Sequence, residues 1–284
     1  MTAQDGPLAL ICGGGSLPLA VADSAAARGR KVLLFPLRGA ADPAVVARYP
    51  HHWLYLGQGG KFKRLARAAG CRDVVFIGSL VRPALWQIRP DLTALKELPR
   101  ILKAFRGGDD HLLSGIGRLL EQHGFRLIGA HDVAPEILVP GGALGRVSPN
   151  ERDCADITLG FEYLRATGPF DVGQAVVVIG RHVVAVEAAE GTDQMLLRVA
   201  DLRKNGRLRA HSGSGVLVKA AKPTQDRRFD LPSVGPQTVE GVARAGLAGL
   251  AVEADSSVVA EPVRMIAAAD RAGVFVVGVV GAER

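Results

Sequence analysis

Aromatic residues are scarce in this chain: Phe, Trp and Tyr make up 5% of its 284 residues, whereas hydrophobic residues as a whole make up 48%. A core large enough for one or two domains must therefore consist of aliphatic side chains. The few aromatic residues are also not interleaved with clusters of Lys and Arg, the pattern of nucleic-acid-binding surfaces. We therefore expect no nucleic-acid partner.

Cysteine is equally rare. The three residues Cys12, Cys71 and Cys154 stand far apart, and none belongs to a CxxC pair. An odd number without paired spacing argues against a disulfide framework and against a zinc site. It favours a protein of a reducing compartment.

Long apolar runs are absent as well. The run Leu8–Cys12 is too short for a signal peptide, and the longest apolar stretch, Val274–Val280, is far shorter than the ~20 residues that cross a bilayer. We therefore expect a cytoplasmic protein. Its Lys and Arg residues exceed its Asp and Glu residues by 35 to 28, and the net charge of +7 favours anionic partners, including peripheral contact with the inner membrane.

What the first half does contain is a regular alternation of short apolar runs and helix-forming segments. Apolar runs at Leu8–Cys12, Lys31–Pro36 and Asp73–Ile77 predict strands, and Trp53–Leu56 is a further candidate. A long helical region is expected from Pro83 to Phe105. This alternation is typical of a Rossmann-like parallel sheet with helices on both faces.

The second half is organised differently. The segment Val139–Gly145 is rich in turn formers and predicts a linker, and a helix is expected to begin at Ser148-Pro149-Asn150-Glu151. Beyond it, β-branched runs on either side of Gly180-Arg181 predict a hairpin. We therefore predict a nucleotide- or phosphate-binding domain over residues 1–138, a linker over 139–147, and a catalytic α/β domain with a mixed sheet over 148–284.

The first strand runs into the loop Gly13-Gly14-Gly15-Ser16, and a helix follows. Such a loop brings backbone N–H groups and a helix N-terminus to a phosphate group. The dinucleotide-binding pattern is incomplete, because Pro18 stands where its third glycine would be, and the alternative is a tight strand-to-helix turn. The candidates for nucleotide or substrate binding are Gly14, Gly15, Ser16 and, after a later strand, Ser79.

Two acidic clusters could bind a cation. Asp109-Asp110 follows two glycines, and Glu190-Gly191-Thr192-Asp193 follows the predicted hairpin. Carboxylates in such positions bind divalent cations, but they are as often caps of the helices that begin there. The candidates are Asp110 and Asp193 as metal ligands and Thr192 as a substrate-binding residue.

The most informative segment is the charged loop Lys222–Pro232, toward which a strand carries Lys219. Within this loop Asp226 is flanked by cations, which favour the carboxylate form. Such an acid can ligate Mg²⁺ or orient water, while Lys and Arg offset the charge that develops in phosphoryl transfer. The alternative is a solvated run of charges. The catalytic candidates are Asp226, Lys219, Lys222 and Gln225, and Arg227 is a substrate-binding candidate.

Three of these segments resemble a known family. Gly13–Pro18, Glu190–Asp193 and above all Lys222–Pro232 are similar to the LpxI-type UDP-2,3-diacylglucosamine pyrophosphatases of lipid A biosynthesis, and the resemblance covers the whole chain. It implies two α/β domains joined by a linker, with the substrate between them. It also implies a magnesium-dependent hydrolase that converts UDP-2,3-diacylglucosamine to 2,3-diacylglucosamine 1-phosphate and UMP, with water attacking the β-phosphorus.

The resemblance also suggests residue roles. The essential aspartate of the family lies in a Lys-Pro-x-Gln-Asp motif, which corresponds to Asp226 in this sequence. Asp226 is thus expected to hold Mg²⁺, or Mn²⁺ in its place, with Asp193 and Asp110 as candidate companions. Contact with the membrane surface is expected to be peripheral. A homodimer is compatible with the sequence.

Two other functions remain compatible with the residues alone. An NADP-dependent oxidoreductase would use the glycine loop, with Arg38 near a 2′-phosphate. A non-catalytic module that binds a nucleotide sugar or lipid would need no acid at position 226. Binding of NADP would distinguish the oxidoreductase from a hydrolase. Turnover of the substrate would distinguish a hydrolase from the non-catalytic module.

Overall fold

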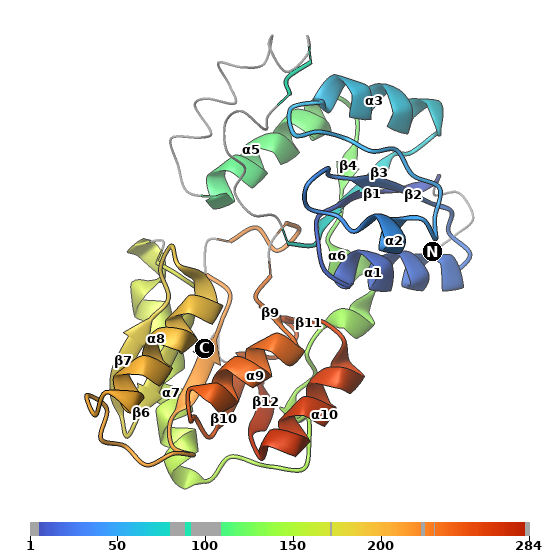
Figure 1. Ribbon diagram of the computed structural model, residues 1–284. Helices are drawn as coiled ribbons and strands as arrows, with labels where there is room; N and C mark the ends of the chain where they lie inside the picture. The colour runs from blue at the N-terminus through green and yellow to red at the C-terminus, as the bar shows by residue number, and fades with distance from the viewer. Residues whose placement is uncertain are drawn as a thin grey trace. The chain divides into compact units, whose positions relative to one another are not determined.

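The computed structural model describes residues 6–79, 89–91, 109–170, 172–222, 225–229 and 231–281, and the side chains of residues 109–114 are not among those described. The helical region expected from Pro83 to Phe105 lies outside these ranges, except for residues 89–91, which are not helical. The chain divides into two compact units (Figure 1). Unit 1 comprises residues 1–137 together with 226–230, and unit 2 comprises residues 138–225 and 231–284.

Unit 1 contains a four-stranded sheet in the order β2-β1-β3-β4, and all of its strands are parallel. The strands are β1 (Leu8–Cys12), β2 (Val32–Pro36), β3 (Asp73–Ile77) and β4 (Arg126–Leu127). The helices are α1 (Leu17–Ala27), α2 (Pro43–Val46), α3 (Gly59–Ala68), α5 (Asp109–Gln122), α6 (Ala130–Val133) and the 3₁₀ helix η2 (Pro135–Ile137). The predicted Rossmann-like parallel sheet is confirmed.

The sheet of unit 1 is covered on both faces. Ala9 and Ile11 of β1 join a cluster that includes Phe62 of α3, whereas Leu8 and Leu10 are completely buried and point to the opposite face, where α1 lies (Figure 1). Successive residues of a strand alternate between faces, so a strand covered on both sides is apolar throughout. This explains why β1 reads as an unbroken apolar run.

The candidate strand Trp53–Leu56 is not a regular strand. The chain runs beside β2 from residue 51 to 54 and pairs with it only at single bridges, Leu34 with His51 and Leu37 with Leu54. The N–H of Leu54 donates to Pro36 O at 2.9 Å, and the N–H of Arg38 donates to Leu54 O at 2.9 Å. Residues 51–54 therefore extend the sheet edge without forming a full ladder.

A buried ion cluster lies at the amino edge of this sheet. Asp73, the first residue of β3, is 1% exposed and accepts hydrogen bonds from Arg30 at 2.5 Å and from Arg126 at 2.6 Å. Burial by itself raises the pKa of Asp73, but the bonds and charges of Arg126 and Arg30 outweigh it and hold that pKa below its usual range. The cluster joins the turn between α1 and β2 to β3 and β4 by charge as well as by packing.

Unit 2 contains a six-stranded sheet in the order β5-β12-β10-β8-β6-β7 and a separate parallel pair, β9 with β11. Strands β8, β10 and β12 are parallel, whereas β5, β6 and β7 pair antiparallel with their neighbours. The strands are β5 (Gly142–Ala143), β6 (Ala175–Ile179), β7 (His182–Val186), β8 (Val216–Lys219), β9 (Ser233–Val234), β10 (Gly249–Glu253), β11 (Val258–Val259) and β12 (Phe275–Val279). The predicted mixed sheet is confirmed, and so is the β6–β7 hairpin.

The helices of unit 2 are divided between the two faces of its sheet (Figure 1). They are α7 (Glu151–Thr167), the 3₁₀ helix η3 (Gly168–Phe170), α8 (Gly191–Lys204), α9 (Pro236–Arg244) and α10 (Pro262–Ala272). Helix α7 packs on the face formed by Val176, Val218 and their neighbours, whereas α8, α9 and α10 pack on the face that includes Val177 and Leu217. The core is aliphatic, as the composition requires.

The structure differs from the sequence-based expectation at the linker, residues 139–147. Val139 is completely buried in the core of unit 2, and β5, within this segment, is the edge strand paired with β12. The N–H of Leu144 donates to Val276 O at 2.8 Å. Glycine serves here for close packing, since a Cβ at Gly141 would lie 2.6 Å from Val280 Cγ2 and one at Gly145 would lie 2.9 Å from Asp270 Oδ1. The glycines of this segment therefore do not mark a free hinge.

The start of α7 also differs from the expectation, by two residues. Asn150, not Ser148, is the N-cap: its side chain accepts the N–H of Arg152 at 2.8 Å and of Asp153 at 3.1 Å. The Asp153 carboxylate in turn accepts the N–H of Asn150 at 3.0 Å. This reciprocal arrangement is a capping box, and it satisfies N–H groups that the first helical turn leaves open.

Candidate active site

The glycine loop of unit 1 follows β1 and is bonded to the loop that follows β3. The N–H of Gly14 donates to Ser79 O at 2.7 Å, and the N–H of Ser79 donates to Gly14 O at 2.9 Å. A Cβ at Gly14 would lie 2.8 Å from Ala40 O, and one at Gly13 would collide with Ser79 O. The glycines thus allow close approach of the loops after β1, β2 and β3.

This loop position fits the site where parallel α/β sheets bind ligands. β2 lies on one side of β1 and β3 lies on the other, so the strand order reverses at β1. In parallel α/β sheets, ligands bind outside the carboxyl ends of the strands at such a reversal. Gly15 is exposed with φ +86°, and the Ser16 hydroxyl does not cap α1. The N–H of Gly14 is bonded to Ser79 O. Gly15 and Ser16 are therefore the residues of this loop that can offer backbone N–H donors to an anion.

Asp226 lies in a tight turn within the segment of unit 1 that comes from late in the chain. The N–H of Phe229 donates to Asp226 O at 3.0 Å, and the N–H of Arg228 donates to Asp226 Oδ1 at 3.1 Å. The turn places the Arg228 guanidinium on the carboxylate, with Nη2 at 2.8 Å from Oδ2 and Nε at 3.0 Å from Oδ1. The predicted domain boundaries place Asp226 in the second domain, whereas it belongs to unit 1.

Two contacts hold this turn on unit 1. The Phe229 ring packs 5.4 Å from the ring of Phe76, the second-to-last residue of β3, and a Cβ at Gly117 of α5 would collide with it. Arg228 Nη1 also donates to Glu121 Oε1 at 2.8 Å. Asp226 is therefore fixed near the carboxyl end of β3, at the same edge of the sheet as Gly15, Ser16 and Ser79.

The charge state of Asp226 follows from its partner. The hydrogen bond from the Arg228 side chain is the largest influence on the pKa of Asp226, and it holds that pKa below its usual range in spite of partial burial. The hydrogen bond to Asp226, together with the bond to Glu121, in turn raises the pKa of Arg228. Asp226 is thus a carboxylate at any pH near neutrality, which suits a cation ligand or a hydrogen-bond acceptor better than a proton acceptor.

Unit 2 gathers polar side chains where its parallel strands end. Lys219, the last residue of β8, is 6% exposed, and its ammonium donates to Thr192 Oγ1 at 3.1 Å and to Ser233 O at 3.0 Å. The Thr192 hydroxyl donates to Glu187 Oε1 at 2.8 Å. This chain of bonds joins β8 to the beginning of α8 and brings the candidates Lys219 and Thr192 together.

The residues just before Asp226 form a second polar group of unit 2. Gln225 is buried, its Oε1 accepts the N–H of Lys222 at 3.1 Å, and its own N–H donates to Lys222 O at 3.0 Å. The N–H of Ala221 donates to Glu253 Oε2 at 3.4 Å, and Glu253, the last residue of β10, is 5% exposed. Gln225 therefore shapes the base of the loop that carries Asp226.

The candidate metal ligands are not gathered into a cluster. Among the residues whose side chains are described, no three or more His, Cys, Asp or Glu residues could jointly hold a metal ion. Asp193 is exposed in the first turn of α8, and the side chain of Asp110 lies outside the described residues. Arg227 is exposed in the Asp226 turn.

Both units match known families. Residues 7–137 match the model of the LpxI N-terminal domain, and residues 140–277 match the model of the LpxI C-terminal domain. A protein of Caulobacter vibrioides, UDP-2,3-diacylglucosamine pyrophosphatase LpxI, is 45% identical over 277 residues, which cover 98% of this chain and 99% of the relative.

The chain belongs to the LpxI family. The resemblance drawn from three short segments is confirmed. Membership of the LpxI family supports a hydrolase and lends no support to the NADP-dependent oxidoreductase. The described part of the chain contains no helix long and apolar enough to span a membrane. Peripheral membrane contact and a homodimer stay predictions.

Sequence reasoning missed several residues that this LpxI family member places around its candidates. Glu187 and Glu253 close apolar strand runs, and an acid in that position was the signal that could have revealed them. Glu121 reads as an ordinary surface charge of a helix, and only its bond to Arg228 gives it significance.

Proposed function

We propose that this protein hydrolyses the diphosphate of UDP-2,3-diacylglucosamine to 2,3-diacylglucosamine 1-phosphate and UMP. The observation that carries the proposal is the position of Asp226: a carboxylate kept ionised by Arg228, fixed near the end of β3 at the edge that also bears Gly15 and Ser16. Parallel sheets bind nucleotides at this edge. The relative from Caulobacter vibrioides bears the name of the same activity.

Asp226 acts on the attacking water. Its carboxylate accepts a hydrogen bond from water and orients an oxygen lone pair toward phosphorus, and the released proton passes to solvent. A weakly basic carboxylate is sufficient for this role because orientation supplies much of the rate enhancement in phosphoryl transfer. One P–O bond forms to the β-phosphorus, and the bond from that phosphorus to the bridging oxygen breaks.

Donors and cations offset the charge of the departing UMP. The backbone N–H groups of Gly15 and Ser16 bind the phosphate that stays with uridine. The side chain of Arg227, on the Asp226 turn, neutralises charge on the phosphoryl oxygens, which is a role of Lys and Arg in phosphoryl transfer, and Lys222 stays a catalytic candidate. The buried ammonium of Lys219 holds Thr192, so we assign Lys219 to positioning.

Magnesium is part of the proposal, with Asp226 as its ligand. The carboxylate accepts two bonds at Oδ1 and two at Oδ2, all from Arg228, and 26% of the side chain stays exposed, so it can offer one monodentate contact on its exposed side. This fits Mg²⁺, which is commonly held by one or two carboxylates together with water and substrate phosphates. When bound, the cation would polarise the phosphoryl oxygens and withdraw charge from them.

Thin-layer chromatography of UDP-2,3-diacylglucosamine incubated with the purified protein tests the activity. We expect UMP and 2,3-diacylglucosamine 1-phosphate in the presence of Mg²⁺, and no turnover in excess chelator until Mg²⁺ or Mn²⁺ is restored. An intact substrate with Mg²⁺ present would overturn the proposal. Full turnover in chelator would overturn only the magnesium requirement. In ¹⁸O-labelled water the label should enter the sugar phosphate and not UMP, and the reverse would place the attack at the α-phosphorus.

A further inference from the structure

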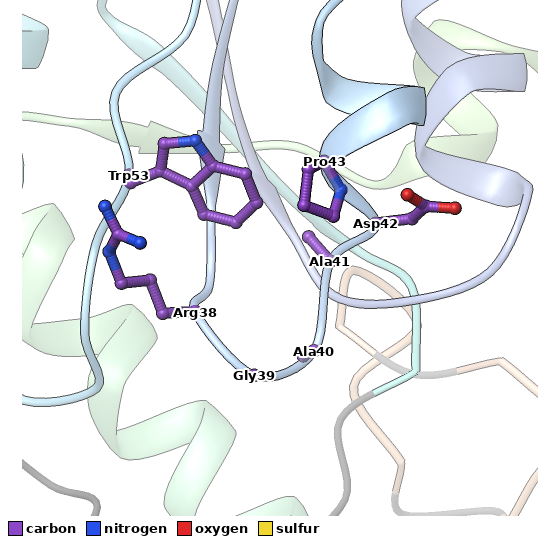
Figure 2. Close-up of a pocket in the computed structure, with 7 residues that line it drawn as sticks. All are labelled: Arg38, Gly39, Ala40, Ala41, Asp42, Pro43 and Trp53. Atoms are coloured by element: carbon purple, nitrogen blue, oxygen red, sulfur yellow. The ribbon is translucent and has the colours of Figure 1, made fainter.

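The carboxyl edge of the unit 1 sheet is open at one end and packed at the other. Beside β2, residues 38–43 and Trp53 line an open pocket of about 590 Å³, and the Trp53 indole and the Pro43 ring lie on opposite sides of it (Figure 2). Beside β3 and β4, the segment 226–229 packs against α5. The strand order β2-β1-β3-β4 puts the glycine loop between these two ends. Asp226 lies at the packed end, so its position depends on that packing.

Helix α5 contacts this segment through two residues that stand about one helical turn apart. Gly117 and Glu121 are separated by four positions, and residues at this spacing lie on the same face of a helix. Glu121 Oε1 accepts a hydrogen bond from Arg228 Nη1 at 2.8 Å. Gly117 faces the Phe229 ring, because a Cβ built at Gly117 would collide with Phe229 Cζ and lie 3.0 Å from Cε2. One face of α5 thus contacts both Arg228 and Phe229.

The Phe229 ring is held by β3 and β4 as well as by α5. It lies 5.4 Å from the ring of Phe76, and both rings pack against the core cluster that includes Leu127. A Cβ at Gly117 would also lie 2.8 Å from Leu127 Cδ1. The end of a leucine side chain can rotate away from such a contact, whereas a rigid ring packed on several elements has to shift as a body. In a close-packed interior such a shift is passed on to the backbone.

Phe229 is linked to Asp226 by the hydrogen bonds of the turn. The N–H of Phe229 donates to Asp226 O at 3.0 Å, and the N–H of Arg228 donates to Asp226 Oδ1 at 3.1 Å. A displaced ring therefore moves the carboxylate with it. Misplacing a reacting group by about 1 Å can lower a rate by about 100-fold. The place of Asp226 thus depends on the room that α5 leaves for the ring.

We propose that Gly117 is a positioning residue for the hydrolysis: it leaves room for the Phe229 ring against α5 and so sets the place of the Asp226 carboxylate. The inference rests on the proposed function, because it takes Asp226 as the catalytic acid. Gly117 has no side chain to offer the substrate and acts through Phe229. Glycine in the interior of a helix is less favourable than alanine, so helix formation alone does not account for it. The contact with Phe229 does.

Steady-state hydrolysis of UDP-2,3-diacylglucosamine by the full-length protein tests this role. Gly117→Ala should lower kcat and kcat/KM equally, by about 10- to 100-fold, because the added methyl group displaces the ring and with it Asp226. The acid limb of the kcat/KM profile should not move, since Arg228 stays bonded to the displaced carboxylate. Urea denaturation of each variant gives the folded fraction, and rates are compared per folded molecule.

Phe229→Leu provides the rescue. Leucine lacks the Cζ and Cε2 atoms that the added methyl group would meet. The double variant Gly117→Ala, Phe229→Leu should be at least about fivefold more active than Gly117→Ala alone, because residues in contact show non-additive effects. Phe229→Leu by itself should be less active than the unaltered protein. Gly59→Ala is the matched control: Gly59 begins α3, and a Cβ there would meet no atom within 4 Å, so activity should be unchanged.

The assignment would be overturned if kcat of Gly117→Ala stayed within about twofold of the unaltered protein. A double variant no more active than Gly117→Ala would overturn it as well, and so would an equal loss in Gly59→Ala. Absence of hydrolysis by the unaltered protein would instead contradict the proposed function. The same double-mutant cycle followed by urea denaturation would then still test the contact, and no coupling between Gly117 and Phe229 would overturn the packing on which the inference depends.

Discussion

Unit 1 carries a carboxylate–arginine group at each edge of one sheet, and the two groups differ in burial. At the amino edge, Asp73 is 1% exposed and is bonded to Arg30 and Arg126. At the carboxyl edge, the side chain of Asp226 is 26% exposed and is bonded to Arg228, which also binds Glu121. Both carboxyl groups have pKa values below their usual range. A lowered pKa thus does not distinguish Asp226, the proposed catalytic acid, from the structural acid Asp73, whereas the two differ in exposure and in place in the fold.

The largest effect expected from this comparison is on turnover. Asp226→Ala should lower kcat by about 10³-fold or more, because one pre-oriented catalytic charge commonly contributes that much. Binding of UMP and the urea midpoint of unfolding should be nearly unchanged, since the side chain is partly exposed. The measurement is the hydrolysis rate at saturating substrate. Retention of a tenth of the activity would rule out the assigned role.

The corresponding change at the amino edge should affect stability instead. Asp73→Asn leaves the buried Arg30 guanidinium without its counter-charge, and breaking a buried pair costs about 3–5 kcal/mol of unfolding free energy. Urea denaturation measures the loss, and kcat of the folded fraction should stay within about twofold. Arg126→Gln is the control: that side chain is 64% exposed, so we expect about 1 kcal/mol or less. A similar loss in both variants would contradict the role of burial.

Much of this fold, but less of the site, follows from the sequence. The apolar runs of β1 and β8 and the helix-forming segments between strands predicted both sheets, because burial on two faces leaves a clear pattern. The linker at 139–147 was misjudged because glycine gives the same signal for flexibility and for close packing. Local patterns also cannot reveal that Asp226 joins unit 1, since that depends on Phe229 packing against Phe76, about 150 residues earlier in the chain.

The pH dependence of activity should show how strongly Arg228 controls the ionisation of Asp226. Asp226 has a lowered pKa, so its ionised form, and the stability gained from the Arg228 bond, persist above the unfolded value of ~3.9 and are lost as the pH falls through the folded value. Arg228→Gln removes the main cause of the shift. The acid limb of the kcat/KM profile should therefore move to higher pH. An unmoved acid limb would show that another group controls it.

The smallest effect is expected at Glu121, the second carboxylate on Arg228. Glu121→Gln removes one exposed ion pair but leaves the bonds between Arg228 and Asp226, and such a pair contributes about 1 kcal/mol or less. Since the Phe229 ring still anchors the turn, kcat should fall only a few-fold and the acid limb should hardly move. Phe229→Ala is the sharper companion, because it removes the packing against Phe76. It should lower kcat more than Glu121→Gln while the pKa of Asp226 stays low. If Glu121→Gln instead matched Asp226→Ala, the two carboxylates would be acting as one catalytic unit through Arg228, and the carboxyl edge would hold two essential acids.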